Sequence, residues 1–367
     1  MIASIKKNDH VLKSIARLGE DSIDEIKRQK NPSVDIPLRN LSNVNFNPKK
    51  AIIEMGKAKQ AREFFNIGMA KKYMQTFLVA EKCKDVLDEG KTVSIRDLYY
   101  MSKSTIPGTS ENTFDEQDES DPIIEDLEVT ADALREELGL YASNKGALVG
   151  EITIRDSGDT IDGRRMGSGG WSIPSICEPN FIQFKRCDAK FILLVEKDAV
   201  FRRLNEDKFW KSHKCILVTG GGQPPRGLRR LLYRMVNELK LPLYTYVDND
   251  PWGYYIYSVV KQGSINLAYE SVRMAVPHAK FIGLSSFDKE RFKLPDNVTI
   301  KLLDEDIKRA KQLLEYPWFQ KTPWQKEIRN MLKLGYKLEQ EALSKRGISF
   351  VTEEYLPKKI KDKDFLD

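Results

Sequence analysis

Short apolar runs alternate with amphipathic stretches throughout the second half of the chain. The runs are rich in valine, leucine and isoleucine, and each is followed by residues with helical spacing. The three pairs comprise residues 189–195 with a helix from Asp198, residues 215–219 with a helix over 225–239, and residues 243–247 with a helix over 252–261. A fourth run covers 281–284, and a final amphipathic helix is expected over 323–343. Because strands that alternate with helices form parallel sheets covered on both faces, this half is predicted to be an α/β domain.

The first half of the chain has a different pattern, in which helical spacing dominates. Apolar residues recur at helical spacing over 48–90 and predict two helices. Ser94 stands three residues before Asp97, as in a capping box, and predicts the start of a short helix. A helix is also expected over 123–138, followed by a strand over 148–154 and a turn at 157–159. Helices followed by a hairpin are typical of a winged helix-turn-helix, so an α+β domain is predicted here.

Length and composition limit the class of protein. The chain has 367 residues, which corresponds to about two to three domains. No uncharged apolar run approaches the roughly 18 residues that span a bilayer, so no membrane segment is expected. The first ten residues include charged side chains and no apolar signal core follows them, so the protein is expected in the cytoplasm. The cysteines, Cys83, Cys177, Cys187 and Cys215, form no C-x-x-C pair and predict buried thiols rather than a zinc site.

The net charge of +6 conceals an uneven distribution. Residues 111–137 hold twelve acidic side chains and one basic side chain, Arg135, which gives this segment a charge of −11 and leaves +17 on the remainder. A basic surplus of this size favours a polyanionic partner such as DNA.

Acidic and glycine residues directly follow the predicted strands of the second half. Glu196 ends the first strand, residues 220–222 are glycines after the second, and Asp248 and Asp250 follow the third. Ligands of open parallel sheets collect at the carboxyl ends of the strands, and carboxylates that meet there repel one another unless a cation binds them. Oxygen ligands of this kind favour Mg²⁺. Taken singly, Asp248 or Asp250 can instead cap the helix that starts at Pro251, and Glu196 can be a solvated loop acid.

A tyrosine is the candidate nucleophile. Arg96 and Tyr100 are four residues apart on the short predicted helix and share a face, whereas Tyr99 points about 100° away. A guanidinium beside a phenol favours the phenolate and can bind a phosphate oxygen. The local pattern alone favours another interpretation, in which both tyrosines are core residues and Arg96 pairs with an acid.

Five short motifs occur in order over most of the chain. They are residues 94–100 (SIRDLYY), 169–174 (GGWSIP), 194–197 (LVEK), 219–224 (TGGGQP) and 247–253 (VDNDPWG). This set resembles the A subunit of archaeal-type DNA topoisomerase VI. The resemblance implies an α+β winged-helix domain that carries the cleavage tyrosine and an α/β Toprim metal domain with a parallel sheet, an architecture shared with the meiotic double-strand-break transesterase. The expected domains are an N-terminal partner-docking region over 1–65, a winged-helix DNA-cleavage domain over 66–165 and a Toprim domain with C-terminal helices over 166–367.

The resemblance also implies roles for individual residues. The second tyrosine of the family's pair is the nucleophile and corresponds to Tyr100, which agrees with the helical-face argument, and Arg96 is expected to assist. The Toprim acids correspond to Glu196, Asp248 and Asp250. Many Toprim domains carry another acid at the position of Trp252, so the number of bound Mg²⁺ ions stays open.

The function implied is that of the catalytic, DNA-cleaving and rejoining subunit of an ATP-dependent type IIB topoisomerase. Tyr100 would form a 5'-phosphotyrosyl intermediate with help from Mg²⁺, and transient double-strand breaks would allow strand passage. The implied partners are double-stranded DNA, a second copy of this chain and an ATP-binding B subunit, in an A2B2 heterotetramer associated with the nucleoid.

Two other functions stay open. A Toprim nuclease would hydrolyse phosphodiesters with metal-activated water and would not need Tyr100. A winged-helix DNA-binding regulator with an inert metal domain would be no enzyme at all. Detection of DNA that stays attached to the denatured protein would separate these alternatives from transesterification.

Overall fold

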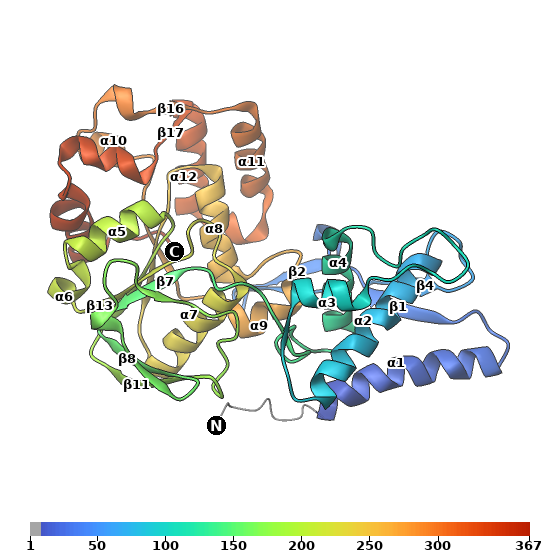
Figure 1. Ribbon diagram of the computed structural model, residues 1–367. Helices are drawn as coiled ribbons and strands as arrows, with labels where there is room; N and C mark the ends of the chain where they lie inside the picture. Colours follow the sequence, from blue (N-terminus) through green and yellow to red (C-terminus); the bar gives the residue numbers. More distant parts are fainter. Residues whose placement is uncertain (1–8) are drawn as a thin grey trace. The chain divides into compact units, whose positions relative to one another are not determined.

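The computed structural model describes residues 9–367, which form two compact units (Figure 1). The first unit comprises the chain up to Val44 together with Met55–Ser143. The second comprises Asn45–Glu54 and Asn144–Asp367. Within residues 9–367, no helix combines the length and the apolar character that crossing a bilayer requires.

The first unit is mainly helical, with short paired strands. Its elements are α1 (Asp9–Lys27), β1 (Ser33–Pro37), β4 (Lys59–Glu63), α2 (Ala70–Asp88), β5 (Val93–Ser94), α3 (Ile95–Ser102), α4 (Ser120–Thr130) and β6 (Leu140–Tyr141). Strand β1 pairs with β4 in antiparallel orientation, and β5 pairs with β6 in parallel orientation. Buried side chains from α1, α2, α3 and α4, including Val79, Leu98 and Leu127, form one core together with Phe114 from the segment between α3 and α4. This core fixes the position of α3.

Helix α3 begins as the sequence predicts. The Ser94 hydroxyl accepts a hydrogen bond from the Asp97 backbone N–H at 3.0 Å, and the Asp97 carboxylate accepts one from the Ser94 N–H at 3.2 Å. This reciprocal capping box satisfies two of the donors that a helix start leaves without partners. Leu98 and Tyr99 are buried, whereas Tyr100 is exposed.

The two helices predicted over 48–90 are wrong for the first part of that range. The chain there forms β3 (Ile52–Met55), which pairs with β2 (Val44–Asn47), and then β4. Only the later part is helical, as α2. Strand β4 pairs with β1, more than twenty residues earlier in the chain, and such distant pairing overrides a local periodicity.

Cations from elsewhere in the first unit partly neutralise the acidic segment over 111–137. Arg39 and Arg62 both bind the Asp126 carboxylate, at 2.9 and 2.6 Å, and Lys71 pairs with Asp115 at 2.8 Å. Helix α4 ends at Thr130, earlier than the predicted 138, because Asp132 adopts a positive φ of 49° that a helix cannot contain. The segment is therefore part of the folded unit.

The second unit is built on a six-stranded, mostly parallel sheet. Its strand order is β10-β7-β13-β12-β14-β15, and β13, β12, β14 and β15 run parallel. The strands are β7 (Ala147–Gly150), β10 (Trp171–Ser172), β12 (Phe191–Val195), β13 (Cys215–Thr219), β14 (Leu243–Tyr246) and β15 (Lys280–Gly283). The helices are α5 (Asp198–Glu206), α6 (Phe209–His213), α7 (Arg226–Leu239), α8 (Pro251–Gln262), α9 (Ser271–Met274), α10 (Asp288–Arg291), α11 (Asp304–Glu315), α12 (Thr322–Leu334) and α13 (Leu356–Lys361). The predicted strand and helix pairs are confirmed.

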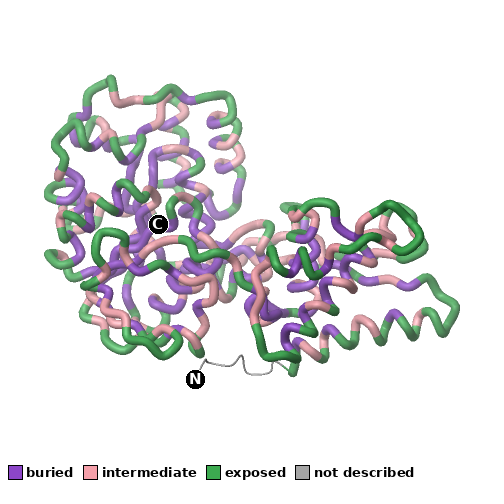
Figure 2. The backbone as a smooth tube through the Cα atoms, viewed as in Figure 1, coloured by how far each residue is buried: buried purple, intermediate pink, exposed green. Residues whose placement is uncertain are grey.

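Both faces of this sheet are covered. Every residue of β12 and β13 is buried, as the colouring of Figure 2 shows for the middle of the sheet. On one face, Leu193 and Ile282 pack with side chains of α5, including Phe201. On the other, Phe281 packs edge-on against Tyr254 of α8 and Trp324 of α12. Burial on both faces explains why these strands are continuous apolar runs in the sequence.

The strand predicted over 148–154 is two strands in two sheets. β7 joins the large sheet, whereas β8 (Ile152–Asp156) pairs with β9 (Asp159–Asp162) and β11 (Ile182–Cys187) in a three-stranded antiparallel sheet. The chain changes sheet at Gly150, whose φ is 134° and where a Cβ atom would lie 2.3 Å from the Cys215 carbonyl oxygen. The hairpin thus belongs to the second compact unit, whose longer segment begins at Asn144, whereas the sequence places a domain boundary at 165/166.

The helix predicted over 323–343 is also shorter in the structure. Helix α12 ends at Leu334 because Gly335 adopts the left-handed conformation, with φ 71°, and donates its N–H to the Met331 carbonyl. The chain then forms β17 (Tyr336–Lys337), which pairs with β16 (Ile300–Lys301), and a 3-10 helix over Gln340–Arg346. The residues between Leu334 and residue 343, which were predicted to be helical, therefore lie at the edge of the large sheet.

The cysteines form no disulfide within residues 9–367. Cys83, Cys177 and Cys215 are buried, and Cys187 is half-buried. Burial raises the pKa of the Cys83 and Cys215 thiols well above its usual value, so both are unreactive at neutral pH.

The capping box gives a first prediction. Replacement Ser94→Ala removes the acceptor for the Asp97 N–H, and such changes cost about 1 kcal/mol. Amides in the first turn of α3 should then exchange with solvent about fivefold faster than in the wild type, measured by native-state hydrogen exchange. Ser94→Thr keeps the hydroxyl and is the control. Equal exchange rates in Ser94→Ala and the wild type would show that the cap does not stabilise α3.

Candidate functional site

The three predicted metal ligands lie at the carboxyl ends of two neighbouring parallel strands. Glu196 follows β12, and Asp248 and Asp250 follow β14, which pairs directly with β12. The Asp248 backbone N–H donates to Glu196 Oε2 at 3.0 Å, and the Glu196 N–H donates to the Tyr246 carbonyl at 3.0 Å. Continuous pairing of the two strands therefore brings the carboxylates to one edge of the sheet.

Asp248 is the most enclosed of the three acids, with 5% of its surface exposed. Its Oδ1 accepts a hydrogen bond from the Gln340 backbone N–H at 2.8 Å, and its Oδ2 lies 3.0 Å from Lys197 Nζ. Lys197 in turn lies 3.0 Å from a carboxylate oxygen of Glu339 and 2.8 Å from one of Glu341. A carboxylate buried to this degree requires such partners because burial penalises its charge.

Asp250 has a second role that the sequence analysis left open. Its Oδ1 accepts from the Gly253 N–H at 2.6 Å and so caps α8, next to Pro251 at the first helical position. The cap uses one oxygen of the Asp250 carboxylate and leaves the other available to a metal ion. Capping and metal binding are therefore compatible uses of Asp250.

All three carboxylates have raised pKa values. Burial is the main cause for Glu196 and Asp250, and the Asp250 charge further raises the pKa of Glu196. Burial and then the Glu196 charge raise the pKa of Asp248 to about 7. For Lys197, ion pairs with Glu341, Asp248 and Glu339 outweigh the effect of burial and raise its pKa. The mutual effects of the acids show that their charges are close enough to repel.

The donor set fits a divalent cation of the hard class. Glu196, Asp248 and Asp250 supply carboxylate oxygens, the preferred ligands of Mg²⁺. In the arrangement that residues 9–367 adopt, no group of three acidic, histidine or cysteine side chains is close enough to hold a metal ion. Internal donors bind one oxygen of Glu196, both oxygens of Asp248 and one oxygen of Asp250.

A second layer of contacts holds the turn between the two aspartates. Asn249 is fully buried and donates through its side chain to Tyr254 and, at 3.4 Å, to Glu327. The Tyr254 hydroxyl donates to Glu327 at 2.6 Å, and the Ser286 N–H donates to the same carboxylate. Burial raises the pKa of Glu327. Helix α12 therefore fixes the backbone of residues 248–250 through Glu327.

The sequence analysis missed Lys197, Glu339 and Glu341 as members of this site. Lys197 adjoins Glu196 in the LVEK motif, which was the available signal. Glu339 and Glu341 were placed on a predicted helix, where residues two apart point in different directions. In the structure both contact Lys197.

The candidate nucleophile lies in the first compact unit. Tyr100 is 59% exposed, and Arg96 is exposed one turn earlier on α3, so both occupy the outer face of this helix. Tyr99 is buried, donates its hydroxyl to the Asp115 carbonyl at 2.9 Å and accepts from Lys103 at 2.7 Å. The interpretation of both tyrosines as core residues therefore holds for Tyr99 alone. Among residues 9–367, no acid lies within ion-pair distance of Arg96.

Comparison with known families matches three consecutive parts of the chain. Residues 71–140 match the model described as type IIB DNA topoisomerase. Residues 144–188 match the all-beta domain in DNA topoisomerase VI alpha subunit, and residues 191–360 match the Toprim domain of the topoisomerase 6 A subunit and Spo11. The A subunit of type 2 DNA topoisomerase 6 from Pyrococcus horikoshii is 42% identical over 96% of this chain and 94% of its own length. The chain belongs to the family of DNA topoisomerase VI A subunits.

Other relatives support the same family. The A subunit of type 2 DNA topoisomerase 6 from Aeropyrum pernix is 44% identical and covers 94% of this chain and 92% of its own length. The A3 subunit of DNA topoisomerase 6 from Oryza sativa subsp. indica is 38% identical over 91% of this chain and 74% of its own length. The resemblance inferred from the five motifs is confirmed, and so are the mixed α+β fold with its Toprim domain and the enzyme class, a type IIB DNA topoisomerase. Toprim domains bind divalent metal ions in general, so the match to this domain implies a site for a divalent metal ion.

The raised pKa of Asp248 gives a prediction for this topoisomerase VI A-type chain. Burial and the Glu196 charge raise the pKa of this carboxyl from its usual 3.8 to about 7, so the folded state binds the proton more tightly than the unfolded state. Proton binding at Asp248 therefore adds to the free energy of unfolding. This contribution is fully present below about pH 4 and is lost as the pH rises through 7. In EDTA, Asp248→Asn should therefore be more stable than the wild type at pH 8. The advantage should grow by roughly 2 to 3 kcal/mol between pH 5 and pH 8 in urea unfolding.

The control for this experiment is Asp198→Asn on α5. Asp198 is exposed and pairs with Arg202, so its replacement changes the net charge equally without removing a buried carboxylate. An advantage of Asp248→Asn that does not change with pH would contradict the assignment of a raised pKa.

Proposed function

We propose that this chain is the DNA-cleaving and rejoining subunit of a type IIB topoisomerase and that Tyr100 is its nucleophile. The observation that supports this most directly is the contrast between two adjacent tyrosines. Tyr99 is buried and its hydroxyl is used in internal hydrogen bonds, whereas Tyr100 presents its ring on the exposed face of α3. A nucleophile must reach the DNA backbone, and Tyr100 is the tyrosine of this pair that can.

The proposed step is a transesterification that conserves the energy of the bond. The Tyr100 hydroxyl oxygen attacks a phosphorus atom, the bond from phosphorus to the 3' oxygen breaks, and the 5' end of the strand is held as a phosphotyrosyl ester. The phenol loses a proton and the leaving 3' oxygen gains one. The reverse reaction reseals the strand without a new energy source. Arg96, on the same face of α3, is placed to bind a phosphate oxygen.

Glu196, Asp248 and Asp250 are the proposed ligands of Mg²⁺. When bound, the ion supplies positive charge that positions the scissile phosphate and stabilises negative charge that develops on its oxygens. The side chains of this chain hold the site: Asp248 is anchored by the Gln340 N–H, and Asp250 is fixed by its cap on α8. Trp252 occupies the position at which many Toprim domains carry a further acid, so the proposed ligand set consists of these three carboxylates.

The proposed assembly is an A2B2 heterotetramer that binds double-stranded DNA and lies in the cytoplasm with the nucleoid. The names of the relatives, which specify an A subunit, support the existence of another subunit. We propose that this B subunit binds ATP and docks on the region over 1–65. Two copies of this chain would then cut the two strands of one duplex.

The first test replaces each tyrosine of the pair. Tyr100→Phe should abolish the covalent protein–DNA adduct, because phenylalanine has no nucleophilic oxygen. Tyr99→Phe removes hydrogen bonds to Asp115 and Lys103 but no reacting group, so adduct yield should stay within about fivefold of the wild type. The adduct is measured by denaturing the reconstituted A and B subunits on DNA in Mg²⁺ and counting the DNA that remains attached to protein.

The result of this test separates three functions. Equal loss of adduct in both variants would contradict the assignment of Tyr100. Strand cleavage without any adduct in the wild type would favour the Toprim nuclease, and DNA binding without cleavage would favour the regulator.

The second test separates metal binding from DNA binding. Glu196→Gln keeps an acceptor for the Asp248 N–H but removes a charge, so cleavage should fall by at least about 100-fold while DNA affinity stays within about twofold. Wild-type enzyme in EDTA should behave in the same way. Cleavage is measured by adduct yield, and binding by filter retention of labelled duplex. Full cleavage by the wild type in EDTA would remove the metal role from these acids.

A further inference from the structure

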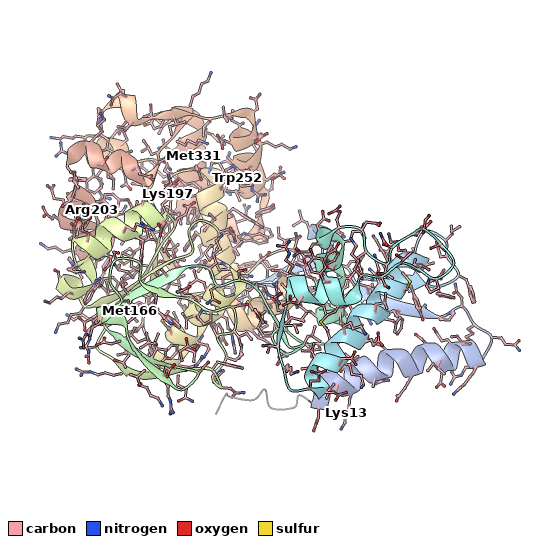
Figure 3. All side chains as sticks on the ribbon, viewed as in Figure 1. Lys13, Met166, Lys197, Arg203, Trp252 and Met331 are labelled. Atoms are coloured by element: carbon pink, nitrogen blue, oxygen red, sulfur yellow. The ribbon has the colours of Figure 1, made fainter. Side chains whose placement is uncertain are left out.

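Lys197 occupies the centre of a group of carboxylates at the edge of the large sheet. It lies at the start of α5 and is labelled in Figure 3. Its ammonium group is 3.0 Å from Asp248 Oδ2, 3.0 Å from Glu339 Oε2 and 2.8 Å from Glu341 Oε2. About a quarter of its side chain is exposed, so the ammonium is largely withdrawn from solvent.

The two glutamates reach Lys197 because the preceding chain is fastened to the turn that carries Asp248. Asn249 and Leu338 exchange two backbone hydrogen bonds, at 2.9 and 3.1 Å. Gln340 donates its N–H to Asp248 and its side-chain amide to the Tyr246 carbonyl, each at 2.8 Å. The side chains of Glu339 and Glu341, on either side of Gln340, both contact the same ammonium group.

The Lys197 ammonium therefore pairs with one buried carboxylate and with two that are partly exposed. Asp248 is buried and is a proposed metal ligand, whereas about half of the side chains of Glu339 and Glu341 is exposed. A divalent cation that ligates Asp248 must share or take the Oδ2 atom that now faces Lys197. After it does so, Lys197 still has two carboxylate partners and is not left as an unpaired charge.

We propose that Lys197 is a resident counter-cation that competes with the divalent metal for Asp248, and that Glu339 and Glu341 hold it when the metal binds. This inference rests on the proposed function of Asp248 as a metal ligand. In this arrangement Lys197 is a positioning residue. It keeps the acidic edge neutralised without metal and lowers the affinity for metal by occupying Asp248, whereas the glutamates raise that affinity by drawing the ammonium away.

The test measures Mg²⁺ binding by the full chain without DNA. Protein freed of metal with EDTA and then dialysed is titrated with MgCl₂ in a calorimeter. Lys197→Met should bind Mg²⁺ about tenfold more tightly than the wild type, because a competing positive charge about 3 Å from the ligand atom has been removed. Its melting temperature should be lower than that of the wild type in EDTA, and the rise produced by Mg²⁺ should be larger.

Matched variants test whether charge alone explains the result. Arg202→Met removes one positive charge from the same helix, where Arg202 pairs with the exposed Asp198, and should leave Mg²⁺ affinity within about twofold. Lys197→Gln is the second variant at the site, for the case that Lys197→Met does not fold. Lys197→Arg keeps the charge and should bind Mg²⁺ no more tightly than the wild type.

A double-mutant cycle tests the part assigned to the glutamates. Glu339→Gln with Glu341→Gln should weaken Mg²⁺ binding about tenfold in the wild type but by less than about twofold when Lys197 is already methionine. Equal weakening in both backgrounds would show that the glutamates act directly on the metal and not through Lys197, and would overturn their assigned role.

The remaining outcomes are also decisive. Unchanged or weaker Mg²⁺ binding by both Lys197→Met and Lys197→Gln, with wild-type binding intact, overturns the competition and leaves the proposed function standing. Absence of binding by the wild type and by the Lys197 variants alike overturns the competition together with the metal role of the acids. Loss of the DNA adduct in Tyr100→Phe does not depend on either result.

Discussion

The burial of charged carboxylates at the ends of β12 and β14 is the constraint on which the second unit depends. Burial raises the pKa of Glu196, Asp248 and Asp250, so each charge needs compensating contacts. The sheet itself supplies one, from the Asp248 N–H to Glu196. The others come from the start of α5, from α8 and from residues 338–341. The chain segment after α12 is thus required, together with α5 and α8, to complete a site whose carboxylates the strands position.

The parallel sheet was predictable because its signal is local. Each of the two central strands is buried on both faces, so it appears as one apolar run, and a helix follows it along the chain. The first half was predicted less well because its strands form through pairing with distant segments, and β4 is largely polar. Lys59–Glu63 is a strand only through pairing with Ser33–Pro37, and no property of residues 59–63 alone reveals that partner. Gly150 likewise separates two strands that local alternation had joined.

The candidate site was predicted in its central residues and missed at its periphery. Glu196, Asp248 and Asp250 follow strands that were correctly placed, so the prediction that they share an edge was correct. Glu339 and Glu341 were missed because of one helix end. Gly335 terminates α12 in the left-handed conformation, and the chain beyond it turns across the sheet edge instead of continuing as a helix. Because the helix was predicted to end at residue 343 and ends at Leu334, the position of these two carboxylates was missed.

In both units a residue that anchors the chain is adjacent in sequence to a candidate functional residue. Tyr99 fixes α3 to its core while Tyr100 faces outward, and Asn249 fixes the turn to Glu327 while the aspartates on either side face the sheet edge. Successive side chains of a helix or an extended segment point in different directions, so a functional residue and its anchor can be adjacent in sequence. The chemistry of such a site therefore depends on the residue that faces it, and its geometry depends on the neighbour that anchors the chain.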